Sequence, residues 1–143
     1  MNRVELLSFL RQHRLCVQSS VTSTGAPQAA VVGYAVSDGL ELVFDTLGST
    51  RKAQNLRRDP RVALVVGWDD DQTVQIEGIA DEPCGEELTR LKQVYFAAFP
   101  DGVERQAWPS IAYFRIRPQW ARYSGFRPGG SVSELDETAL RQR

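Results

Sequence analysis

Residues 44–56 read Phe44-Asp45-Thr46-Leu47-Gly48-Ser49-Thr50-Arg51-Lys52-Ala53-Gln54-Asn55-Leu56. An apolar, β-branched run at 40–44 predicts a strand, a short turn follows it, and Ser49 or Thr50 can cap a helix through Arg57. A strand that leads directly into a capped helix gathers free backbone N–H groups and hydroxyls at one place. This arrangement favours phosphate binding.

The two cations at 51 and 52 are unusual for the first turn of a helix, where the helix dipole favours acidic residues. We interpret Arg51 and Lys52 as an anion clamp, in which arginine forks onto oxygens and lysine acts as a point charge. A solvated basic patch at an exposed helix start would have the same sequence. Both interpretations remain open at this level.

Composition limits the class of protein. A chain of 143 residues is long enough for one domain with a substantial core. The net charge is −1 without a basic stripe, so we expect no nucleic-acid partner. No apolar run reaches the ~20 residues that span a bilayer. The first residues lack an apolar signal segment, and Cys16 and Cys84 suit free thiols, so we expect a cytoplasmic protein.

Composition also excludes several chemistries. His13 is the single histidine, and no cysteine or histidine cluster has metal-ligand spacing, so we expect no metal site. A Ser-His-Asp hydrolase would have to use His13, which ends a predicted helix. Neither a Walker-type loop nor a Rossmann glycine motif occurs. If the protein is an enzyme, a bound organic cofactor must supply the reactivity.

Hydrophobic periodicity and turn residues predict a mainly β fold, an antiparallel barrel with peripheral helices. The predicted helices cover 2–12, 49–57 and 85–98. The predicted strands cover 15–21, 28–36, 40–46, 61–68, 73–80 and 111–124, the last being either a pair or one strand broken at Pro118. We expect 126–143 to form a mobile C-terminal tail or a short helix from Ser133.

These pieces, in this order, resemble the FMN-binding split-barrel proteins related to pyridoxamine 5′-phosphate oxidase. The resemblance covers residues 1–125, which we expect to form one flavin-binding domain. The segments that carry it are 44–46, 49–52, Asn55-Leu56, Asp59-Pro60-Arg61-Val62, the hairpin at Trp68, Gln75-Ile76-Glu77-Gly78, and Phe114-Arg115-Ile116-Arg117-Pro118 with Trp120. It implies a six-stranded antiparallel split barrel and a homodimer with FMN between the subunits.

The resemblance implies a phosphate site at the start of the second helix. By position, Arg51 and Lys52 would bind the FMN phosphate, and Ser49 and Thr50 would assist them. Two residues before the turn would contact the cofactor largely through their backbone, namely Asp45 and Thr46.

The resemblance also implies ring contacts from other strands. Three residues of the second strand would run along the isoalloxazine ring, namely Ala30, Val31 and Val32. Gln75, or Thr73 on the same face, would reach the ring or the ribityl chain. Trp120 would contact the cofactor from the partner subunit.

Two differences from the oxidases affect the expected substrate. The oxidases carry an arginine and a lysine in the second strand, at positions that we align with Gln28 and Gly33, and no histidine follows His13. We therefore expect an FMN-dependent oxidoreductase of unassigned substrate that is not a vitamin B6 oxidase. A deazaflavin could replace FMN. A non-catalytic flavin carrier or sensor, and an interaction module without a ligand, are the alternatives.

Overall fold

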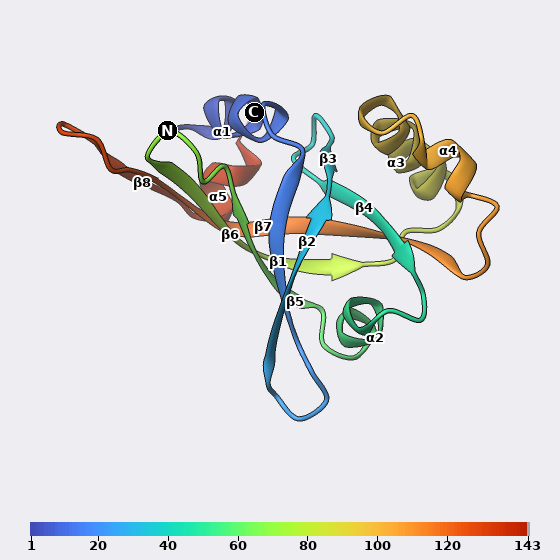
Figure 1. The fold of residues 1–143 in the computed structure, drawn as a ribbon. Helices are drawn as coiled ribbons and strands as arrows, with labels where there is room; N and C mark the ends of the chain where they lie inside the picture. The colour runs from blue at the N-terminus through green and yellow to red at the C-terminus, as the bar shows by residue number, and fades with distance from the viewer. Residues whose placement is uncertain (143) are drawn as a thin grey trace.

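The computed structural model describes residues 1–142, and its strands form one curled antiparallel sheet (Figure 1). The order is β2-β1-β5-β6-β7-β4-β3, and β8 pairs with β7. The strands are β1 (Leu15–Val21), β2 (Pro27–Gly33), β3 (Ala35–Val36), β4 (Leu42–Leu47), β5 (Arg61–Val66), β6 (Gln72–Asp81), β7 (Ile111–Gly125) and β8 (Val132–Leu135). The mainly β split-barrel fold is confirmed, with two more strands in the described chain than the six predicted.

The helices lie around the sheet. They are α1 (Arg3–Arg11), α2 (Arg51–Arg58), α3 (Gly85–Ala98), α4 (Gly102–Arg105) and α5 (Glu137–Arg141). Figure 1 shows α1 beside α5, α2 near the far ends of β1 and β2, and α3 with α4 outside β4. The three predicted helices are confirmed, α5 lies where a short terminal helix was the alternative to a mobile tail, and α4 was not predicted. No helix within residues 1–142 is long and apolar enough to cross a membrane.

The predicted second strand is divided at Tyr34. Its first part, β2, pairs with β1, and its second part, β3, pairs with β4. The Tyr34 N–H donates to the Arg14 carbonyl at 3.0 Å, and its hydroxyl donates to the Leu10 carbonyl at 2.6 Å. Because these bonds tie Tyr34 to the end of α1 rather than to a strand, the chain leaves one side of the barrel and enters the other.

The last predicted strand is continuous through Pro118. Gly78 of β6 faces Pro118, whereas Glu77 faces Trp120, so Gln119 is the extra residue of a β-bulge. The alternation predicted for β6 is confirmed, because Val74, Ile76, Gly78 and Ala80 are all buried.

The expectation of a mobile tail needs correction for residues 132–141. These residues form β8 and α5, and the side chains of Leu135 and Leu140 are buried in the main core. The N-terminal ammonium of Met1 donates to the Ser133 hydroxyl at 2.9 Å, which joins the two ends of the chain. Burial of two leucines stabilises a segment whose glycines and proline predicted mobility. The predicted terminal helix is present, but it begins at Glu137.

Candidate cofactor site

The turn between β4 and α2 carries the predicted anion clamp. Thr50 is the N-cap of α2, and its side chain accepts a hydrogen bond from the Ala53 N–H. The hydroxyls of Thr46 and Thr50 lie 3.0 Å apart, which ties the end of β4 to the cap. The first N–H groups of a helix lack intrahelical acceptors. Since Thr50 caps Ala53, the N–H groups of Arg51 and Lys52 are available to an anion.

The two clamp cations carry unbalanced charge. Arg51 is exposed and Lys52 is half-buried. Within residues 1–142 neither forms an ion pair, whereas Arg57 and Arg61 nearby pair with carboxylates at 2.7 Å. The first turn of α2 contains no acidic residue. Positive charge and free N–H groups therefore coincide at the start of α2, which is chemically suited to a phosphate.

The clamp turn is held from two sides. The Gly48 N–H donates to the Ser110 carbonyl at 2.6 Å, and the Gly48 carbonyl accepts from Arg57 at 3.0 Å. Arg57 is itself fixed by a bidentate pair with Glu82. A side chain at position 48 would press on Ser110 and Arg57, so glycine suits this close approach.

Helix α2 is anchored to the first two strands by a buried amide. Nδ2 of Asn55 donates to the Ser20 hydroxyl at 3.1 Å and to Oε1 of Gln28 at 2.7 Å. Asn55 is 4% exposed and lies one turn after Arg51 and Lys52. This network fixes the side of α2 that faces the barrel, so the clamp has a defined position relative to β2.

Asp45 is engaged through its side chain, which is largely enclosed between β4, α3 and α4. Tyr95 donates its hydroxyl to one carboxylate oxygen at 2.9 Å, and Nε of Arg105 donates to the other at 2.8 Å. Burial, and then the charge of Asp45, raise the pKa of Tyr95 to about 12, so its hydroxyl stays protonated as a donor. Only the backbone of Asp45 is left for the predicted contact with a cofactor.

The residues predicted to line the ring lie in different surroundings. Val32 packs against the core, Ala30 is half-buried, and Val31 is 60% exposed. Gln75 and Thr73 lie on β6, and the Arg122 guanidinium stacks over Trp120 on β7 at 5.5 Å.

The predicted β6 and β7 residues lie beyond the part of β7 that pairs with β4. Thr46 pairs with Ala112 of β7, whereas Trp120 lies eight residues further along the same strand. Eight residues of extended strand span ~26 Å. Thr73 and Gln75 pair with Ser124 and Arg122, which lie further still from Ala112. Within one subunit, the structure gathers residues 45–52 at the turn, and it places Thr73, Gln75 and Trp120 on β6 and β7 beyond the stretch of β7 that pairs with β4.

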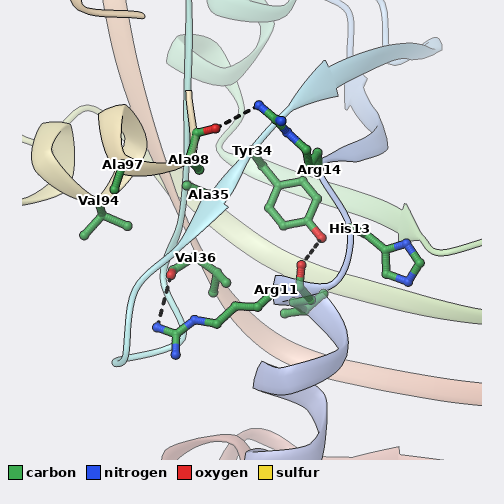
Figure 2. A pocket seen from close by; sticks show the side chains of 10 residues that line it. Arg11, His13, Arg14, Tyr34, Ala35, Val36, Val94, Ala97 and Ala98 are labelled. Atoms are coloured by element: carbon green, nitrogen blue, oxygen red, sulfur yellow. Dashed lines mark hydrogen bonds between the residues drawn. The ribbon is translucent and has the colours of Figure 1, made fainter. Parts of the chain in front are cut away.

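A separate cavity of about 480 Å³ lies between the end of α1, β3 and α3 (Figure 2). Arg14 donates to the Ala98 carbonyl at 2.8 Å and Arg11 to the Val36 carbonyl at 3.4 Å. Arg11 also pairs with Asp38. The lining contains none of the predicted cofactor residues, and both arginines already have acceptors. This cavity is distinct from the clamp.

Sequence reasoning missed three residues at or near the site and one inside the barrel. Asn55 lies in the motif at 44–56 but has no local pattern that assigns it a role, and Tyr95 and Arg105 lie 50 and 60 residues from Asp45. Gln18 is 2% exposed, and neither of its amide atoms has a partner within residues 1–142. A glutamine in the inward-facing series Cys16, Gln18 and Ser20 was the available signal for a polar group inside the barrel.

Comparison with known proteins defines the class. The family model for pyridoxamine 5′-phosphate oxidase matches residues 3–125. The pyridoxine/pyridoxamine 5′-phosphate oxidase of Rubrobacter xylanophilus is 34% identical over 106 residues, which are 73% of this chain and 47% of that protein. The chain therefore belongs to the pyridoxamine 5′-phosphate oxidase family, as its motifs indicated. It spans less than half the length of the curated relatives it matches.

Solved structures share the fold at lower identity. A heme-binding protein from Mycobacterium smegmatis aligns with a TM-score of 0.85 and 20% identity, over 96% of this chain and 58% of that one. An FAD-binding protein from Mesorhizobium loti aligns with a TM-score of 0.69 and 19% identity, over 86% and 92% of the two chains. At these identities the likeness supports the split-barrel fold alone.

Proposed function

We propose that this protein binds FMN through the clamp at the start of α2 and acts as a flavin-dependent oxidoreductase. One observation carries the proposal: Arg51 and Lys52 lie side by side at a helix N-terminus without an ion-pair partner in residues 1–142. Membership of the pyridoxamine 5′-phosphate oxidase family supports the flavin as the phosphate-bearing ligand.

The residues of the clamp have separable roles toward a phosphate. Arg51 offers a planar fork of donors, and Lys52 offers a compact charge closer to the barrel. The N–H groups of the first turn would also donate to the phosphate. The hydrogen bond between the Thr46 and Thr50 hydroxyls holds the turn against the end of β4. A bound flavin would supply the electron transfer, and the protein would bind and orient it.

The proposal includes a homodimer with the cofactor between subunits. Trp120 lies on β7 eight residues beyond the partner of Thr46, and Thr73 and Gln75 lie on β6, so in this proposal a second copy brings these side chains to the clamp. An outward-facing apolar row supports a contact surface, because Val31 pairs with Val17 and Val17 pairs with Val65 across three strands.

The surroundings of β2 favour a substrate other than a vitamin B6 phosphate. Gln28 is neutral and is already bonded to Asn55. Gly33 lies against Phe99, and a Cβ atom at position 33 would be only 2.9 Å from the Phe99 ring. Neither position offers a cation to a substrate phosphate. A cytoplasmic location is also part of the proposal, since Cys16 and Cys84 are free.

Three other ligands are alternatives to FMN, namely a deazaflavin, FAD and heme. FAD and heme are included because proteins of this fold bind them. His13 is the single histidine, and its Nε2 is buried without a partner within residues 1–142. Because that nitrogen is buried, it would not be available to a heme iron, so FMN is the ligand we propose first.

Anaerobic reduction of the reconstituted protein tests the proposed activity. The protein is loaded with FMN, desalted, and mixed with NADH or NADPH. Bleaching of the flavin band, followed by recovery with an electron acceptor and repeated turnover, is the expected result. A protein that retains FMN but resists both donors would be a flavin carrier or sensor. A protein that retains no FMN would refute the proposal.

A further inference from the structure

A buried carboxylate lies on the strand that leads into the clamp, six residues before Arg51. Asp45 is followed directly by Thr46, whose hydroxyl contacts the Thr50 cap at 3.0 Å. The Asp45 side chain is only 10% exposed, so water screens its charge poorly. An uncompensated charge here would repel the phosphate that the clamp is proposed to hold.

Arg105 cancels this charge from a different part of the chain. Its Nε donates to Oδ2 of Asp45 at 2.8 Å, and its Nη2 donates to the Tyr95 hydroxyl at 3.1 Å. Its side chain is 18% exposed, so the pair lies in a partly dehydrated environment. Nη1 of Arg105 also contacts Asp101, whose side chain is 69% exposed and screened by solvent.

The segment that carries Arg105 also contacts the clamp turn. It runs from α3 through α4 to Ser110, whose carbonyl accepts from the Gly48 N–H at 2.6 Å. The same segment therefore contacts Asp45 and Gly48, on the two sides of Thr46. The segment therefore influences the charge of the site through Asp45 and the shape of the clamp turn through Gly48.

We propose that Arg105 is a positioning residue for anion binding, which raises the affinity of the clamp by neutralising Asp45. The inference rests on the proposed function and deepens it. Arg105 acts through Asp45 and need not touch the cofactor. Its charge makes the site receptive to a phosphate dianion, whereas Arg51 and Lys52 provide the direct contacts.

Three variants separate this role from a structural one. Arg105→Met leaves the Asp45 carboxylate without its cation, and Asp45→Asn removes the carboxylate. The double variant removes both charges together. Arg90→Met is the matched control, because Arg90 of α3 likewise ties a helix to a carboxylate beside β4, through a bidentate pair with Glu41. FMN affinity is measured by quenching of flavin fluorescence, and thermal unfolding of each ligand-free variant is recorded.

We expect Arg105→Met to weaken FMN binding ~10-fold, equivalent to ~1.4 kcal/mol. The double variant should recover most of that loss, because no uncompensated charge remains. Riboflavin lacks the phosphate, so its affinity should fall much less in Arg105→Met. Arg90→Met should bind FMN as the wild type does, whatever its unfolding temperature.

Other results would overturn the inference. If Arg105→Met binds FMN as tightly as Arg90→Met, Arg105 has no role at the site. If the double variant stays as weak as Arg105→Met, charge neutralisation is wrong. If the wild type binds no FMN, the proposed function fails, and the same variants are titrated with inorganic phosphate. Binding of phosphate that depends on Arg105 would then sustain the inference alone, and absence of such binding would end both.

Discussion

Removing both clamp cations should abolish cofactor binding while leaving the fold intact. A hydrogen bond to a charged group contributes ~1.5–3 kcal/mol, so Arg51 and Lys52 together would contribute ~3–6 kcal/mol to phosphate binding. Arg51 is exposed, which favours the lower end of this range. We therefore expect Arg51→Ala/Lys52→Ala to weaken FMN binding by at least ~100-fold.

The same change should not destabilise the ligand-free protein. Cations in a first helical turn oppose the helix dipole by ~0.3–1 kcal/mol each. No carboxylate within residues 1–142 pairs with either clamp residue, whereas Arg57 has Glu82. The free energy of unfolding of the double variant should be equal to or slightly above that of the wild type. The opposite signs of the two effects separate a binding role from a folding role.

Fluorescence titration with FMN and urea unfolding measure the two quantities. Arg58→Ala is the matched control, because Arg58 is an exposed cation in the last turn of the same helix, where its charge suits the dipole. It should keep FMN affinity within about twofold and lower stability slightly. A double variant that binds FMN as tightly as Arg58→Ala would refute the clamp assignment.

Three further changes have defined outcomes. Gln18→Met should raise the unfolding free energy of the ligand-free protein by ~1 kcal/mol in urea melts, because it replaces a buried amide that lacks partners; a loss of stability would contradict this. Arg115 hydrogen-bonds Asp81 and holds the pKa of that carboxyl below its usual range. Since the folded pKa is depressed, the pair stabilises the fold above pH ~4 and is lost as pH falls below it. Arg115→Met should therefore make the stability of the fold less dependent on pH in the acid range, as measured by circular dichroism. An unchanged acid profile would count against the pair. Val31→Asp should shift the proposed dimer toward monomer in light scattering, and an unaffected dimer would place the contact elsewhere.

The local features of the fold were readable from the sequence because short-range physics decides them. Thr50 caps α2, and the side chains of Asn2 and Glu5 form a reciprocal capping box at α1. The period-two pattern of β6 follows from one face being buried. In each case the residues that determine the structure lie within a few positions of one another.

The features that sequence reasoning missed depend on residues far apart in the chain. The division of the second strand requires Tyr34 to meet the carbonyls of Leu10 and Arg14, which no local pattern encodes. The pairing of Asp45 with Arg105 joins residues 60 positions apart, and α4 has only four residues, too few for a helical period. The continuity of β7 through Pro118 depends on its pairing with β6, which the sequence left open.

The visible absorption spectrum of the purified protein, before and after addition of FMN and desalting, tests the central claim most directly. We expect a flavin band that survives desalting in the wild type and is lost in Arg51→Ala/Lys52→Ala. A flat spectrum from a folded wild-type protein in both samples would contradict FMN binding at the start of α2.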